Sequence, residues 1–209
     1  MYTLGIFKLT SCDMSKMKNI TYIGNNFLHV SATTNIIKYP DFSKLKEIKN
    51  GFGSSAQTSI DIDTAINVET IGDGFLKAVE TLTTVNLSSM RNVKTVGDEF
   101  LGNCYSLTYA DLSNMVKLEN VGEKFMRCCA DTTKLYKVPD IHDSNSFYNY
   151  SIIKELYIYA PELQTNLKTS IFRNNVNTNL VIYVPESLVS EYEEYYMDTD
   201  IAGKFAAIS

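Results

Sequence analysis

The amino-acid sequence predicts a repeat solenoid, mainly β with short helical turns, in which a right-handed coil stacks short strands into a parallel sheet and ends in a C-terminal helical cap. Three observations predict this fold. A short apolar motif recurs at a nearly constant spacing, apolar and polar residues alternate within each unit, and the last predicted strand runs into an amphipathic segment. A period of about 20–29 residues indicates units that bury their apolar faces only by stacking on their neighbours.

The recurring motif places a Phe four residues after an Ile or Val. It occurs as Ile23 with Phe27, Ile48 with Phe52, Ile71 with Phe75, Val96 with Phe100 and Val121 with Phe125. The steps between successive Ile/Val positions are 25, 23, 25 and 25 residues. Two further apolar columns precede the motif, namely Ile20, Leu45, Val68, Val93 and Leu118, and Met14, Tyr39, Ile62, Leu87 and Leu112. Three columns that keep their register through five units are typical of a solenoid.

Each unit is predicted to contain a short strand followed by a turn. Residues 107–113, LTYADLS, alternate between apolar and polar side chains, and residues 9–15 and 82–88 follow the same template. Such period-two segments indicate strands, which we expect to stack in parallel about 4.8 Å apart as one long sheet. Gly97 or Gly122 is expected to allow the turn that follows, and the next residues to form a helical turn. The Phe side chains are therefore expected to form one buried column.

The chain is predicted to be a single domain spanning residues 1–209. Regular repeats cover about 9–129, irregular repeats cover 130–185, and the C-terminal cap covers 186–209. The final strand is expected at 180–186, followed by an amphipathic helix at about 186–197 with Leu188, Tyr192 and Tyr195 or Tyr196 on one face. An open solenoid needs such a cap, because its last unit otherwise exposes apolar side chains and unpaired strand edges.

Composition narrows the possible partners. The chain has 209 residues, 44% of them hydrophobic, so it can fold around a core, and its formal net charge is −5 without a block of Lys or Arg. This charge argues against a nucleic-acid partner. The N-terminus lacks the pattern of a secretory signal, and no segment approaches the roughly 18 consecutive apolar residues of a membrane span. We expect a monomeric domain without membrane insertion.

No set of reacting groups stands out. Cys12, Cys104, Cys128 and Cys129 form no C-x-x-C pair, and we expect four free thiols, with a disulfide among the last three as the alternative. The only histidines, His29 and His142, are not arranged as parts of a nucleophile–base set. The sequence therefore predicts a protein that is not an enzyme and that carries no cofactor and no metal.

The outward positions of the predicted strands form the one patterned set of polar residues. They are Ser11, Ile36, Ser59, Thr84 and Tyr109, then Asp13, Lys38, Asp61, Asn86 and Asp111, then Ser15, Pro40, Asp63, Ser88 and Ser113. Tyr109, Asp111, Asn86 and Asp61 are the candidate ligand-binding group, because they combine an aromatic anchor with hydrogen-bonding groups on adjacent rungs. A simply solvated face is the alternative, and a calcium site with Asp61 and Asp63 is a weaker one.

The frame LxxxxLSxMxxLxxVGxxFLxxC and the ending IYVPESLVSEYEEYY, residues 182–196, resemble the BspA-like leucine-rich repeat family. The resemblance covers roughly residues 9–205 and implies a leucine-rich-repeat-type solenoid. It also implies a surface or secreted protein that binds a protein or glycan, hence an extracellular or cell-surface location and an adhesion role. Related repeats in some viruses make a virion location possible. The alternative function is a structural spacer or appendage component of a larger surface or virion assembly.

Overall fold

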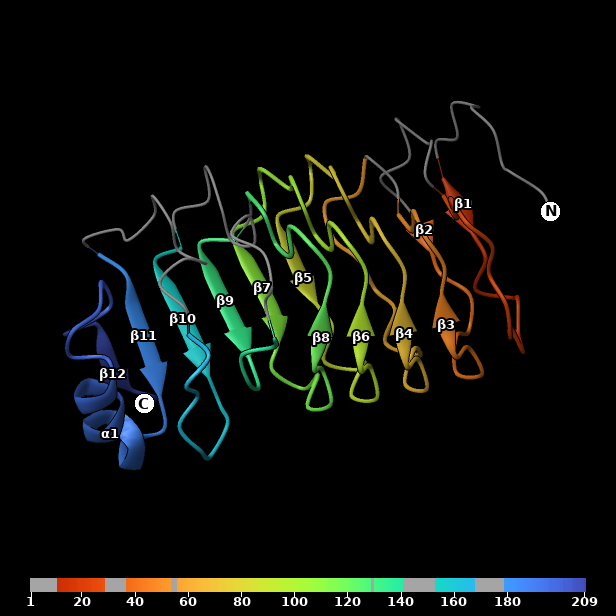
Figure 1. Cartoon of the computed structure of the whole chain (residues 1–209). Helices are drawn as coiled ribbons and strands as arrows, with labels where there is room; N and C mark the ends of the chain where they lie inside the picture. The colour runs from red at the N-terminus through yellow and green to blue at the C-terminus, as the bar shows by residue number, and fades with distance from the viewer. Residues whose placement is uncertain (1–10, 29–36, 54–55, 129, 141–152, 168–178) are drawn as a thin grey trace.

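The computed structural model describes residues 11–28, 37–53, 56–128, 130–140, 153–167 and 179–209. Figure 1 shows that these residues form a stack of short strands along one axis, with the N-terminal strands at one end and the helix α1 at the other. Every paired strand runs parallel to its neighbour. The predicted parallel-stranded solenoid is confirmed.

Three sheets make up the stack. A two-stranded sheet holds β1 (Cys12–Asp13) and β2 (Ile37–Lys38), and a four-stranded sheet holds β3 (Glu47–Ile48), β4 (Thr70–Ile71), β6 (Thr95–Val96) and β8 (Asn120–Val121). The six-stranded sheet follows the order β12-β11-β10-β9-β7-β5. Its strands are β5 (Thr84–Asn86), β7 (Tyr109–Leu112), β9 (Thr132–Leu135), β10 (Glu155–Ile158), β11 (Val181–Val184) and β12 (Phe205–Ala207).

The prediction of one long sheet is wrong at one rung. Residues 59–62 form no strand, so β2 and β5 belong to different sheets. The rung still alternates, with Ile60 and Ile62 buried, and the backbone N–H of Thr83 still donates to the oxygen of Thr58 at 3.1 Å. The break falls in the 23-residue unit, whose shorter connection leaves this rung less freedom to align with β2.

The Phe column is confirmed from Phe52 to Phe125. Phe52, Phe75, Phe100 and Phe125 are buried and stacked at successive centroid distances of 5.2, 5.2 and 5.5 Å. Phe27 was predicted to be buried but is only half-buried, because it packs on Phe52 at 5.5 Å as the first member of the column. Buried residues from Ile23 to Phe205 form one hydrophobic cluster. The 1–209 domain boundary stays a prediction.

The segments predicted as helical turns are tight turns with left-handed residues instead. Glu99, Leu101 and Asn103 have φ values of 57°, 55° and 62°. Their backbone N–H groups bond other rungs rather than their own turn: the N–H of Leu101 donates to Phe75 O at 2.9 Å, and that of Asn103 to Arg127 O at 2.7 Å. A bond within the turn, from the N–H of Gly102 to Glu99 O at 2.9 Å, is also present, but the left-handed residues beside it keep the turn from forming a right-handed helix.

The motif glycines serve close packing rather than the turn conformation. Neither Gly97 nor Gly122 has a positive φ. A Cβ at Gly97 would lie 2.6 Å from the backbone N of Asp73, and one at Gly122 would lie 2.4 Å from that of Asp98. In the space that glycine leaves, Asp73 Oδ1 accepts the N–H of Asp98 at 2.9 Å. Each rung is thereby tied to the next.

The C-terminal cap contains an additional strand. After the 3₁₀ helix η2 (Glu186–Leu188) and α1 (Val189–Tyr195), the chain returns to the sheet as β12, so the strand predicted at 180–186 is not the last. A three-residue strand without a matching repeat gave no periodic signal. Tyr192 and Tyr196 are buried against Phe205 at centroid distances of 5.1 and 5.6 Å, whereas Tyr195 is 53% exposed. Tyr196 therefore completes the apolar face of the cap.

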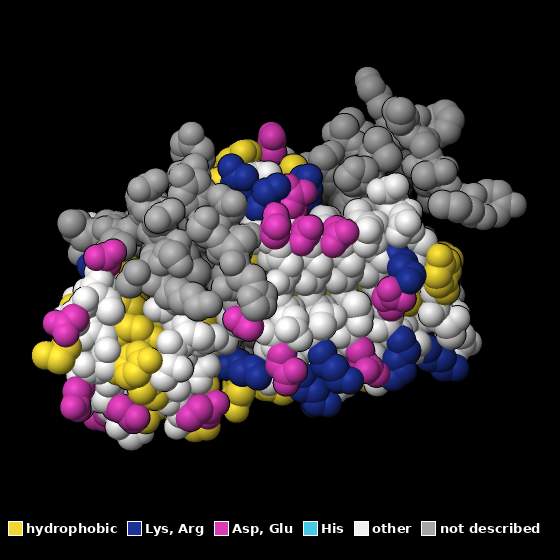
Figure 2. All heavy atoms as spheres, viewed as in Figure 1, with side chains coloured by type: hydrophobic (Ala, Val, Ile, Leu, Met, Phe, Trp, Pro, Cys, Tyr) yellow, Lys and Arg dark blue, Asp and Glu magenta, His cyan; other side chains and the backbone are white. Residues whose placement is uncertain are grey.

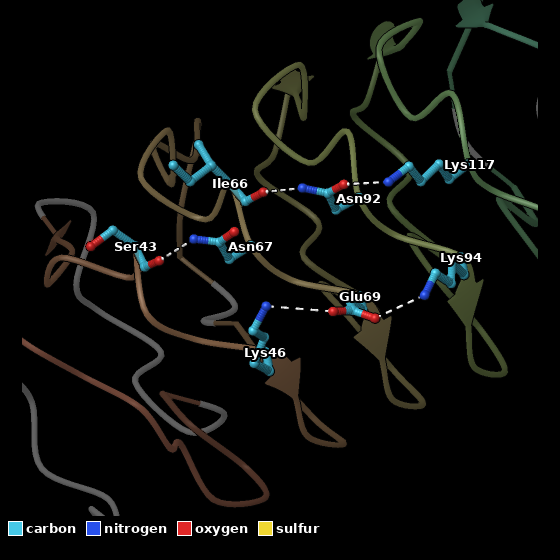
Figure 3. Close-up of polar contacts among 8 residues, drawn as sticks. All are labelled: Ser43, Lys46, Ile66, Asn67, Glu69, Asn92, Lys94 and Lys117. Carbon is cyan, nitrogen blue, oxygen red and sulfur yellow. Dashed lines mark hydrogen bonds and ion pairs between the residues drawn. The ribbon is translucent and has the colours of Figure 1, made fainter.

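Polar side chains also join successive rungs beside the four-stranded sheet (Figure 3). The Asn92 amide donates to Ile66 O at 2.9 Å and accepts a hydrogen bond from the Lys117 ammonium at 2.7 Å. Glu69 pairs with Lys94 at 2.9 Å and with Lys46 at 3.5 Å. Figure 2 shows basic and acidic side chains alternating along the lower border of this face. Such exposed pairs contribute little stability each, but their alternation favours one register of the stack.

Candidate functional site

The outward side of the six-stranded sheet brings three of the four predicted site residues together. In the register of β5 with β7, Thr84 lies beside Tyr109 and Asn86 beside Asp111. Tyr109 and Asp111 are half-buried and Asn86 is exposed, while the intervening Val85 and Ala110 point into the core. Period-two alternation therefore placed these side chains on the correct face.

Hydrogen bonds hold the carboxylate of Asp111 in place. Its Oδ1 accepts the Ser113 hydroxyl at 2.6 Å and the Ser113 backbone N–H at 3.0 Å, and its Oδ2 accepts the Tyr109 hydroxyl at 3.1 Å. Burial raises the pKa of Tyr109, and the neighbouring charge of Asp111 adds to this effect. The phenol of Tyr109 therefore stays protonated at neutral pH and can donate its hydrogen bond to Asp111.

Asp61, the fourth predicted site residue, is exposed and lies on a rung that forms no strand. It belongs to the rung before β5 and lines a hollow of about 400 Å³ together with Lys38, Tyr39 and Asp63. Pro40 was predicted to face outward but is buried and lines the same hollow, where the sheet is broken. Among the described residues, no group of three or more His, Cys, Asp or Glu is placed to hold a metal ion.

The face continues over β9, β10 and β11, where the sequence analysis named no site residue. Asp111 is in register with Lys134, Lys134 with Tyr157, and Tyr157 with Tyr183. The Lys134 ammonium lies 5.6 Å from the ring centroid of Tyr109 and 5.3 Å from that of Tyr157. Tyr157 stacks on Tyr183 at 4.4 Å with an interplanar angle of 13°.

Glu155 supplies a second carboxylate to this row. Its Oε2 accepts the hydroxyl of Thr132 at 3.2 Å and that of Tyr157 at 3.5 Å. Burial raises the pKa of Tyr157, and the charge of Glu155 adds to this. Burial opposes the charged form of Lys134, but its interactions with Tyr109, Tyr159 and Asp111 together outweigh this and raise its pKa. We call Tyr109, Asp111, Lys134, Glu155, Tyr157 and Tyr183 the tyrosine face.

A comparison with protein-family models identifies the repeats. The model for the BspA type leucine-rich repeat region, present in six copies, matches residues 4–133 and 47–179. The chain belongs to the BspA-type leucine-rich repeat family. Proteins of this family are generally repeat modules for protein interaction or adhesion, typically without enzymatic activity and usually associated with a surface. No curated protein matches the chain.

Outward tyrosines distinguish the BspA-type repeats at the tyrosine face from the preceding ones. The outward residues of the earlier rungs are mostly small or charged, whereas β10 and β11 present Tyr157 and Tyr183. The signal was present in the sequence, because residues 155–159 and 181–184 alternate with period two. Residues 155–159 were assigned to the irregular repeats and residues 180–186 to the final strand, so their outward tyrosines were not considered as site residues.

Cys12 and Cys104 carry free thiols. Cys104 and Cys128 are buried and Cys12 is half-buried, while Cys129, His29 and His142 lie outside the described residues. The Cys104 thiol donates to Leu76 O at 3.0 Å, and burial raises the pKa of this thiol to about 12. A thiol with such a pKa is not a nucleophile at neutral pH. In the described part of the chain, no helix is both long enough and apolar enough to span a bilayer.

Proposed function

We propose that this chain is a non-enzymatic binding or adhesion module that recognises a protein or glycan through the tyrosine face. The observation that carries the proposal is the continuous row of aromatic and charged side chains on adjacent strands β7, β9, β10 and β11. Half-exposed tyrosines provide rigid contact area at low entropic cost, and they are enriched among residues that dominate binding energy.

The polar groups of the row support recognition of hydroxyl-bearing or amide-bearing ligands. The carboxylates of Asp111 and Glu155 accept hydrogen bonds, and the ammonium of Lys134 donates them. In the described structure, no carboxylate lies within 4.0 Å of the Lys134 ammonium, the distance of a salt bridge. The ammonium lies instead over the rings of Tyr109 and Tyr157. Glycan hydroxyls and peptide backbone groups both match this mixture of donors and acceptors.

The proposal is tested by identifying a ligand and then removing parts of the face. A glycan array and a pull-down from surface extracts supply candidate ligands, and affinities are measured for Tyr109→Ala and Asp111→Ala. We expect Tyr109→Ala to weaken binding about 30-fold, the effect of losing a residue that dominates an interface. Tyr22→Ala is the matched control, because Tyr22 is 70% exposed on the first rungs. Unchanged affinity in both face variants would assign binding to the turns, or leave a spacer role.

We also propose that the module works as a monomer at an extracellular or cell surface, with a virion surface as the alternative. Its support is the usual surface association of the family. Antibody labelling of intact cells and of purified particles separates the two locations. Labelling that requires permeabilised cells in every case would contradict both.

A further inference from the structure

The stack of tyrosine rings ends at an open ring face. Tyr157 and Tyr183 stack at 4.4 Å, close to the strand spacing of about 4.8 Å, so each ring stands upright over its own strand. The next position in the register is Ala206 on β12, the edge strand of the sheet. Among the described residues, Tyr157 is the only ring that stacks on Tyr183. On the side of Ala206, no second described ring continues the stack.

The opposite end of the same stack shows what these rings accept. There the Lys134 ammonium lies 5.3 Å from the Tyr157 centroid. A cation over a tyrosine face is attracted by the negative potential of the ring. The two-ring stack thus has a cation on one side, and among the described residues no stacked ring and no cation over the ring on the other.

The net charge of the molecule is concentrated in the C-terminal cap, at the same end of the solenoid as Tyr183. Residues 186–209 contain six acidic residues and one basic residue, Lys204, which sum to −5; this equals the charge of the whole chain, so residues 1–185 sum to zero. The acidic residues are Glu186, Glu191, Glu193, Glu194, Asp198 and Asp200. The Glu193 carboxylate accepts the backbone N–H groups of Gly203 and Phe205 at 3.1 and 3.3 Å. Glu193 therefore lies against β12, well within a Debye length of about 8–10 Å.

We propose that the open face of Tyr183 above Ala206, which we call the edge ledge, binds an arginine side chain of a protein partner. This inference rests on the proposed function and selects a basic protein rather than a glycan as its ligand. The acidic cap draws cationic partners toward this end of the solenoid. A planar guanidinium lies flat on a ring and fills a one-ring gap in a stack, whereas an ammonium remains a strongly hydrated point charge.

Short labelled peptides test the ledge on the full chain. Binding of hexa-arginine and hexa-lysine is measured by fluorescence anisotropy at low ionic strength. We expect hexa-arginine to bind more tightly, and Tyr183→Leu to weaken hexa-arginine about three- to fivefold while leaving hexa-lysine nearly unchanged. The double variant Glu191→Gln with Glu194→Gln should weaken both peptides equally, because these exposed carboxylates supply attraction without stacking.

A second variant keeps the test decisive if Tyr183→Leu unfolds the protein. Ala206→Arg places a guanidinium of the chain itself on the ledge and should remove the preference for arginine while Tyr183 is retained. An arginine-to-lysine affinity ratio that is unchanged in Ala206→Arg overturns the ledge, as does tighter binding of a neutral glycan at the same site. Failure of the ledge leaves the proposed function intact if Tyr109→Ala still loses its ligand. If Ala206→Arg removes the preference for arginine but Tyr109→Ala binds its ligand with unchanged affinity, the ledge is supported and only the proposed role of the wider tyrosine face is overturned.

Discussion

Phe100 sits at the centre of the aromatic column that fills the solenoid. Its ring stacks on Phe75 at 5.2 Å and on Phe125 at 5.5 Å, and its side chain is fully buried. Phe100→Ala should lower the free energy of unfolding by about 3–5 kcal/mol, because it removes transfer energy and leaves a cavity between two rings. Urea denaturation measures this change. Tyr105→Ala, at a site 61% exposed, is the control, and similar losses in both variants would contradict the column's role.

Thr133 is a fully buried polar residue in the same core. It occupies an inward position of β9 between Ala110 and Leu156, and its hydroxyl has no hydrogen-bond partner among the described residues. Thr133→Val keeps the shape and removes the unpaired hydroxyl, so we expect a gain of about 1–2 kcal/mol. Thermal unfolding compares it with Thr132→Val, which loses the bond to Glu155 and should not be stabilised. Destabilisation by Thr133→Val would show that the hydroxyl is satisfied.

At the scale of the element, the strands and the core columns were predictable because their periods are local. Alternation in LTYADLS fixes which side chains of β7 face inward, whatever the neighbouring rung does. The turns were not predictable, because Leu101 and Asn103 bond to rungs that are distant in sequence. The three residues of β12 carry no repeat signal, and their place is set by packing on α1. Of the tyrosine face, only Tyr109 and Asp111 were named from the sequence, since Lys134 and Tyr157 become neighbours of Tyr109 only through the sheet register.

The motif glycine connects one turn to the next. Gly97→Ala should cost about 2–3 kcal/mol, because its Cβ would meet the Asp73 backbone N at 2.6 Å and neither rung can move alone. Gly24→Ala is the matched control, since Gly24 holds the same motif position and its nearest atom in the described structure, Tyr22 Cε1, is at 4.0 Å. Chemical denaturation of both variants gives the comparison. Equal stabilities of Gly97→Ala and Gly24→Ala would mean that close packing against Asp73 is not the reason for a glycine at position 97.

Glu193 protects the exposed edge of β12. Its two carboxylate oxygens accept the N–H groups of Gly203 and Phe205, which otherwise remain unpaired at the end of the sheet. Glu193→Ala should lower stability by about 1–3 kcal/mol and speed hydrogen exchange at these two amides. Glu194→Ala removes an exposed carboxylate next to it and should change neither quantity. Slow hydrogen exchange at both amides in Glu193→Ala would mean that the N–H groups of Gly203 and Phe205 have another acceptor.

At the scale of the whole molecule, stability is transmitted along one axis. Each rung makes backbone hydrogen bonds to the rungs on both sides. For example, the N–H of Leu101 donates to Phe75 O, and the N–H of Met126 donates to Phe100 O. Interactions between neighbours of this kind make the ends of a solenoid its weakest rungs. The C-terminal end is therefore held by a cap, whose tyrosine hydroxyls reach back into the stack.

Deleting residues 186–209 tests this dependence. The deletion removes the Tyr192 hydroxyl that accepts Gln164 N at 2.9 Å and the Tyr196 hydroxyl that donates to Gln164 O at 2.6 Å, and it uncovers the edge of β11. It also removes the entire formal net charge of −5. We expect the shortened chain to unfold at a lower temperature and to associate, because an open strand edge and a net charge of zero both favour aggregation.

Charge and edge exposure are separated by a full-length control. Glu191→Gln with Glu194→Gln lowers the charge of the cap but retains α1, β12 and the Glu193 contacts. We expect this variant to elute as a monomer in size-exclusion chromatography with an unchanged Tm, whereas the deletion elutes as larger species. Association of both proteins would assign solubility to charge alone. A monomeric deletion variant with the original Tm would show that the stack is stable without its cap, because β11 then tolerates being the end of the sheet.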